Sequence, residues 1–140
     1  MSQFNQAELY FGHGTDDAWS EALSLAKHVL YLPHDLNEQD TQLLLQSRLT
    51  QVEKLAILDL VKRRIIERVP AAYLTHRAWF CGLPFYVDER VLVPRSPFAE
   101  LIRDGFNSWL EDEPEHILDL CTGSACIAIA LAYQFEDAQV

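Results

Sequence analysis

The sequence contains few of the residues that would indicate a secreted, zinc-binding or nucleic-acid-binding protein. Its 140 residues include three cysteines, Cys81, Cys121 and Cys126, an odd number without a Cys-x-x-Cys pair. This argues against a disulfide framework or a metal site and favours a reducing compartment. Lysine and arginine number 11 against 21 aspartates and glutamates, and the formal net charge is -10. That balance argues against general nucleic-acid binding and is compatible with a basic protein partner.

The sequence also lacks the features that direct a chain to a membrane. No apolar run approaches the ~20 residues that span a bilayer, and the first residues lack the basic start and apolar core of a signal peptide. We therefore expect a cytoplasmic protein with no membrane partner. The hydrophobic fraction of 49% is typical of a globular chain.

Apolar periodicity predicts two helices early in the chain. The first covers residues 18–30, with a capping residue among residues 15–17, and it ends before Pro33. A weaker helix is expected over residues 37–46, where the leucines at 43–45 would form its buried patch. Both helices would contribute to a small N-terminal bundle.

A third helix has the clearest start signal. Thr50 and Glu53 have the spacing of a capping box, and Pro70 marks the end of the helix. The predicted buried stripe is Val52, Leu55, Leu58, Val61, Ile65 and Val69. We predict that the helical domain covers residues 1–72.

The pattern changes to aromatic and β-branched residues over 73–95, which predicts a β-hairpin linker with its turn at 82–84. Its expected core is Trp79, Phe80, Phe85 and Tyr86. Ser96 and Pro97 can then start a helix that runs to about Leu110.

The stretch from Ile117 to Ala132 predicts a strand, a small-residue turn and a helix in that order. Asp119 lies in the strand, and the turn contains Gly123. This is how a nucleotide-type binding unit begins, because the turn brings backbone close to a ligand and the helix N-terminus presents N–H groups to it. The missing GxGxxG and Gly-Lys-Ser/Thr patterns argue against a dinucleotide dehydrogenase and a P-loop.

Two elements together resemble the protein-glutamine N-methyltransferases, which use S-adenosylmethionine. One is the linker, Arg68-Val69-Pro70-Ala71-Ala72-Tyr73-Leu74 followed by Val91-Leu92-Val93-Pro94-Arg95. The other is the turn, Asp119-Leu120-Cys121-Thr122-Gly123-Ser124. The segments 10–16 and 78–82 make the chain more similar to the branch that modifies large-subunit ribosomal protein three than to the release-factor branch.

The resemblance implies a helical substrate-recognition domain, a hairpin linker and, over residues 96–140, the start of a doubly wound α/β S-adenosylmethionine-binding domain. Only its first strand and helix would be present, so the chain would be the N-terminal part of a longer enzyme. The family's Asn-Pro-Pro-Tyr motif does not occur in these 140 residues. We therefore assign no catalytic residue and expect this chain by itself to be inactive.

The resemblance also assigns half of a cofactor site. The residues that would surround the methionine end of S-adenosylmethionine are Asp119, Cys121, Thr122, Gly123, Ser124 and Ala125. The family has glycine where Ala125 stands. If φ is positive there, the methyl group costs on the order of 1 kcal/mol, and if φ is negative it costs almost nothing.

Other residues admit both functional and plain structural interpretations. Arg95 and Glu100 could border the substrate pocket or form a salt bridge or cap. The basic residues of the third helix could touch RNA, or they form a solvated face that complements the helix dipole; they are Lys62, Arg63, Arg64 and Arg68. His13 and Asp16 are explained better by loop and cap chemistry than by a metal.

Two further functional hypotheses remain open at this point. The chain could be the sibling enzyme that acts on release factors, or a non-catalytic module that binds a basic protein. Independently of these hypotheses, an unpaired strand over 117–120 could promote a dimer through the unfinished sheet.

Overall fold

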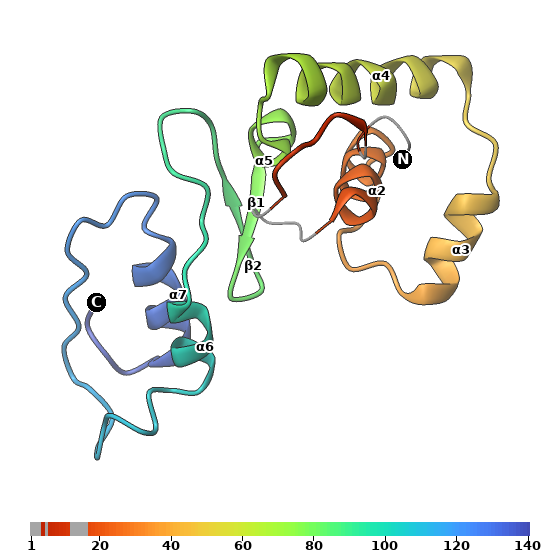
Figure 1. Ribbon diagram of the computed structural model, residues 1–140. Coiled ribbons are helices and arrows are strands. Elements are labelled where there is room, and N and C mark those ends of the chain that lie inside the picture. Colours follow the sequence, from red (N-terminus) through yellow and green to blue (C-terminus); the bar gives the residue numbers. More distant parts are fainter. Residues whose placement is uncertain (1–3, 5, 12–16) are drawn as a thin grey trace. The chain divides into compact units, whose positions relative to one another are not determined.

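The computed structural model describes residues 4, 6–11 and 17–140. The chain divides into two compact units, of which the first ends at Thr75 and the second begins at His76, and each is considered by itself (Figure 1). The loop with His13 and Asp16 lies outside the described residues, so its interpretation is untested.

The first unit is helical, and the three predicted helices are confirmed. The elements are α2 (Ala18–Val29), α3 (Glu38–Gln46), α4 (Gln51–Lys62), the π-helical turn η1 (Arg63–Glu67) and α5 (Ala71–Thr75). The short helix α5 follows directly after Pro70 and was not predicted. It contributes Ala71 and Leu74 to the core.

Side-chain caps define the starts of the first three helices. The carboxylate of Asp17 accepts from the backbone N–H groups of Trp19 and Ser20, at 2.7 and 2.8 Å. Thr50 and Glu53 form the predicted reciprocal capping box, in which Thr50 N donates to Glu53 Oε2 at 2.7 Å. These contacts satisfy donors that a helix N-terminus leaves free.

The predicted buried faces of α3 and α4 are partly wrong. The core of the first unit is Phe4, Leu9, Ala18, Leu25, Ala71 and Leu74, with Leu60, Val61, Ile65 and Val69 packed against it. Only the second half of α4 and the turn after it reach this core, so Val52, Leu55 and Leu58 stay exposed. Leu43 and Leu45 of α3 are 59% and 46% exposed.

A buried ion pair joins α2 to the turn after α4. Arg64 Nε lies 2.7 Å from Glu21 Oε1, and both side chains are almost fully buried. Arg64 Nη2 also donates to Tyr10 O at 2.9 Å, and Arg68 Nη1 donates to Ala7 O at 2.8 Å. The interpretation of these arginines as a solvated face is therefore wrong for Arg64, whose charge is used inside the unit.

The second unit begins with the predicted hairpin. Strands β1 (Arg77–Phe80) and β2 (Leu83–Tyr86) pair antiparallel. The turn lies at Cys81 and Gly82, whose φ values of 51° and 82° suit a two-residue hairpin turn. It therefore lies earlier than predicted, and Pro84 belongs to β2. Of the expected hairpin core, Phe80 is buried and Phe85 packs against it, whereas Trp79 and Tyr86 are exposed.

Two helices complete the second unit, α6 (Phe98–Arg103) and α7 (Cys126–Gln134). They pack through a core of Phe80, Ile102, Cys126, Ala130, Leu131 and Phe135. The helix α6 ends earlier than the predicted Leu110 because Gly105 and Phe106 adopt left-handed φ values of 63° and 55°. In the part of the chain that the structure describes, no helix could cross a membrane.

The predicted strand over residues 117–120 does not form as a strand. A single parallel bridge joins His116 to Gln139, in which Ile117 N donates to Gln139 O at 2.8 Å and Gln139 N donates to Glu115 O at 2.9 Å. Leu118 and Leu120 are 80% and 74% exposed. A strand needs a hydrogen-bonded neighbour along its length, and among the described residues this segment has one only at its start. The bridge nevertheless has the parallel sense of a strand–helix–strand unit.

A carboxylate beside the hairpin gives a pH-dependent prediction. Hydrogen bonds from the Arg90 side chain hold the pKa of Asp88 at about 2, below its ordinary 3.8; Arg90 Nη2 lies 2.6 Å from Asp88 Oδ2. Because the pKa is lowered, the pair stabilises the fold above the ordinary pKa and stops doing so as the pH falls toward 2. In Arg90→Gln, NMR titration should show the pKa of Asp88 rising toward 3.8, whereas Arg103→Gln should leave it unchanged. A value that stays near 2 in Arg90→Gln would contradict this cause.

Candidate cofactor site at the turn before α7

The sequence-predicted cofactor residues form one continuous turn between the extended segment after His116 and the start of α7. Thr122 Oγ1 donates to Asp119 O at 3.0 Å, and Ala125 N donates to Thr122 O at 2.9 Å. Ala125 is the N-cap of α7, and Ile129 N donates to its carbonyl at 2.9 Å. The turn therefore returns the chain directly into the helix.

Three residues of this turn have left-handed backbone. The φ values are 62° at Cys121, 58° at Gly123 and 60° at Ala125. Of the two outcomes left open for Ala125 by the sequence, the structure has the positive φ. An L-residue with a Cβ is strained in this region by about 1 kcal/mol, so the turn holds its shape against the preference of Ala125.

Ala125→Gly should therefore stabilise the second unit by about 1 kcal/mol, because glycine adopts positive φ without a Cβ clash. The matched control is Ala128→Gly inside α7, which should destabilise it by about 1 kcal/mol, because glycine is unfavourable in a helix interior. Urea unfolding of both variants measures the two opposite signs. A loss of stability in Ala125→Gly would show that the positive φ is not a source of strain.

Asp119 supplies a buried acceptor. Its Oδ2 is inaccessible to solvent and has no hydrogen-bond partner among the described residues. A buried carboxylate oxygen without a donor is costly, so this atom is suited to receive a donor from a bound molecule. A positively charged donor such as an ammonium group would satisfy it best.

The start of α7 supplies the opposite polarity. The N-cap residue Ala125 makes no side-chain hydrogen bond to the first-turn N–H groups of this nine-residue helix. Such groups and the helix dipole favour an anion. A carboxylate acceptor at one end of this turn and an anion-favouring helix start at the other correspond to the ammonium and carboxylate groups of an amino acid.

The three cysteines have different surroundings. Cys121 is exposed in the turn, while Cys126 is buried in the core of the second unit. Burial raises the pKa of the Cys81 thiol, whose Sγ lies 3.8 Å from Ala99 O. A raised pKa makes Cys81 a poor nucleophile.

The two candidate substrate-pocket residues lie at the start of α6. Arg95 is exposed just before the helix, and Glu100 is exposed in its first turn. The helix start is closed by Ser96 Oγ, which accepts from Phe98 N at 3.2 Å. Ser96 therefore contributes the side-chain hydrogen bond at this helix start, and the substrate-pocket role of Arg95 and Glu100 stays a prediction.

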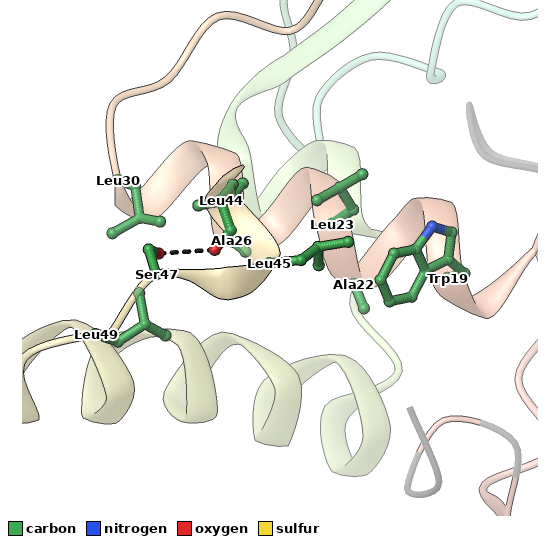
Figure 2. Close-up of a pocket in the computed structure, with 9 residues that line it drawn as sticks. All are labelled: Trp19, Ala22, Leu23, Ala26, Leu30, Leu44, Leu45, Ser47 and Leu49. Carbon is green, nitrogen blue, oxygen red and sulfur yellow. Dashed lines mark hydrogen bonds between the residues drawn. The ribbon is translucent and has the colours of Figure 1, made fainter. Parts of the chain in front are cut away.

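Sequence reasoning missed a hollow in the first unit. A cavity of about 230 Å³ lies between α2 and α3, and its lining side chains are shown in Figure 2. The lining includes Trp19 and Leu23 of α2, Leu30 directly after it, and Leu44 and Leu45 of α3. The signal that could have revealed it is the run of leucines in α3, which the sequence suggested to be buried.

Comparison with known proteins identifies relatives along the whole chain. It is 50% identical over 142 residues to the ribosomal protein uL3 glutamine methyltransferase of Neisseria gonorrhoeae and 49% identical to that of Neisseria meningitidis serogroup A. Each alignment covers 100% of this chain and 46% of the relative, so the chain spans about half the length of these relatives. No protein-family model matches the chain. By sequence, the whole of this chain is therefore similar to part of the enzymes named as ribosomal protein uL3 glutamine methyltransferases.

Proposed function

We propose that this chain is part of an S-adenosylmethionine-dependent enzyme that methylates a glutamine side-chain amide nitrogen on ribosomal protein uL3. The observation that carries the proposal is the 50% identity, over the whole chain, to a protein named for that reaction. The activity belongs to the protein at the length of its relatives. The 140 residues contain no Asn-Pro-Pro-Tyr sequence and no residue to which we assign a catalytic role.

The turn before α7 fits the amino-acid end of S-adenosylmethionine. The unpartnered Asp119 Oδ2 would accept from its ammonium group, and the first-turn N–H groups of α7 would donate to its carboxylate. Thr122, Gly123, Ser124 and Ala125, together with Cys121, would bring their backbone close to it. When bound, this cofactor supplies an electrophilic methyl group, while the residues of the turn fix its orientation.

Orientation matters for this reaction because the amide lone pair of glutamine is delocalised, which makes the nitrogen a weak nucleophile. Holding the methyl donor and the amide in line converts a bimolecular reaction into an effectively unimolecular one, which can supply much of the rate enhancement. The site in this chain would contribute the cofactor half of that alignment. We assign Arg95 and Glu100, at the start of α6, to the border of the substrate pocket.

The domain roles follow the same proposal. The helical residues 1–72 would recognise the protein substrate, and residues 96–140 would begin the cofactor-binding domain. The hairpin linker 73–95 would connect these two domains. The protein would act in the cytoplasm, where a ribosomal protein is available during subunit assembly. The acidic net charge of -10 is compatible with a basic protein substrate.

The test is methyl transfer from radiolabelled S-adenosylmethionine by the protein expressed at the full length of its coding sequence. Purified ribosomal protein uL3 should be labelled on glutamine, whereas a peptide-release factor offered at the same concentration should not. Labelling of the release factor alone would favour the sibling enzyme. No labelling of either substrate, with retained binding of uL3, would favour the non-catalytic binding module.

A further inference from the structure

Ala125 is held in a left-handed conformation by the backbone bonds on either side of it. Its φ and ψ are 60° and 13°. Its N–H group donates to Thr122 O, and its carbonyl accepts from Ile129 N, each at 2.9 Å. The first bond closes the turn and the second begins α7, so the conformation of Ala125 sets how the turn is joined to the helix.

The two sides of this junction are anchored to different degrees. Cys126, the first residue of α7, is buried in the core of the second unit, as are Ala130 and Leu131 further along the helix. Residues 121–123, on the other side of the junction, are exposed. A change of backbone conformation at Ala125 would therefore move the turn and leave α7 in place.

The forces that act on Ala125 oppose each other and are of similar size. The left-handed region disfavours the closed turn, in which Ala125 has positive φ, by about fivefold or more for a residue with a Cβ. The bond from Ala125 N to Thr122 O favours the closed turn by about two- to tenfold, the usual net contribution of one hydrogen bond. The alternative is a right-handed Ala125 that extends α7 by one residue, which suits alanine because it has the highest helix propensity. Both conformations should therefore be populated when no ligand is bound.

We propose that Ala125 is a positioning residue that limits the affinity for S-adenosylmethionine through this conformational equilibrium. The closed turn sets the spacing between the unpartnered Asp119 Oδ2 and the first-turn N–H groups of α7, so the amino-acid end of the cofactor would select it. The apparent affinity is then the intrinsic affinity multiplied by the fraction of free molecules in which the turn is closed. This inference rests on the proposed function for the identity of the cofactor.

The experiment is calorimetric titration of S-adenosylmethionine into the protein expressed at the full length of its coding sequence. Ala125→Gly removes the Cβ and with it the strain, so this variant should bind about three- to fivefold more tightly than wild type. Ala125→Val places a β-branched residue at the same φ, where such a residue is a steric outlier, and should weaken binding by at least threefold. Affinity should therefore fall in the order glycine, alanine, valine.

A second measurement follows the conformation of Ala125 itself. The three-bond coupling between its amide and Cα protons, measured by NMR, reports φ and is averaged over conformations that exchange rapidly. In the free wild-type protein this coupling should lie between the left-handed and right-handed values, and it should reach the left-handed value when S-adenosylmethionine is saturating. A left-handed value already present in the free protein would overturn the inference.

Ala128→Gly is the matched control, because it makes the same chemical change inside α7. It lies outside the turn and should leave the affinity within about twofold of wild type. Unchanged or weaker binding by Ala125→Gly, or an equal gain in Ala128→Gly, would overturn the inference and leave the proposed cofactor in place. No binding of S-adenosylmethionine by the wild type at full length would instead overturn the proposed cofactor site, and the inference would fall with it.

Discussion

Arg64→Met should lower the free energy of unfolding by about 3–5 kcal/mol, because it removes the cation that pairs with the buried carboxylate of Glu21. The two groups lie 2.7 Å apart, and their side chains are 5% and 3% exposed. The substitution also removes the donor to Tyr10 O. Urea-induced unfolding followed by far-UV circular dichroism measures the change.

The neighbouring arginine provides the control. Arg63 pairs with Glu67 at 3.6 Å, but these side chains are 44% and 55% exposed, so Arg63→Met should cost no more than about 1 kcal/mol. The double variant Glu21→Leu with Arg64→Met should recover much of the lost stability, because it removes both charges and leaves apolar groups in their place. Equal effects of Arg63→Met and Arg64→Met would show that burial does not decide the strength of the pair.

Asp119→Asn should weaken S-adenosylmethionine binding by about 10- to 150-fold, the loss expected for one hydrogen bond between charged groups. Asparagine keeps the shape of the side chain and removes its charge. The measurement is calorimetric titration of the cofactor into the protein expressed at full length. Folding stability should not fall, because Asp119 Oδ2 has no hydrogen-bond partner to lose among the described residues.

Asp137→Asn is the matched control for this prediction. It makes the same change at an exposed carboxylate of the second unit and should leave cofactor affinity within about twofold of wild type, as surface changes away from a site generally have small effects. A drop in stability without a change in affinity would assign Asp119 a structural role. Unchanged affinity in Asp119→Asn would remove it from the cofactor site.

Local signals in the sequence were sufficient to predict where α2, α3 and α4 begin. Asp17, Asn37 and Thr50 cap α2, α3 and α4, and a cap depends on neighbours within three residues, which a sequence displays directly. The end of α6 was placed too late because the left-handed residues Gly105 and Phe106 are only partly visible in the sequence. Glycine signals such a conformation, whereas phenylalanine does not.

The sequence predicted which residues form the candidate site, but it did not predict the burial of the Asp119 carboxylate oxygen or the backbone conformation of the turn. The order of Asp119, Gly123 and the following apolar helix can be seen in the sequence. The solvent-inaccessible Oδ2 atom and the φ of 60° at Ala125 depend on how the turn folds back against Thr122. The strand over 117–120 was predicted from its composition and did not form, because a strand also requires a neighbour to pair with.

The sequence by itself determined the helical first half, the hairpin and the resemblance to the glutamine methyltransferases, because periodicity, caps and motifs are local properties. Tertiary structure decided which charges and leucines are buried. Glu21 and Arg64 are 43 positions apart, and nothing near either residue marks them as partners. The leucines of α3 have the composition of a core helix, yet Leu44 and Leu45 line an open hollow, because burial depends on the elements that surround a helix.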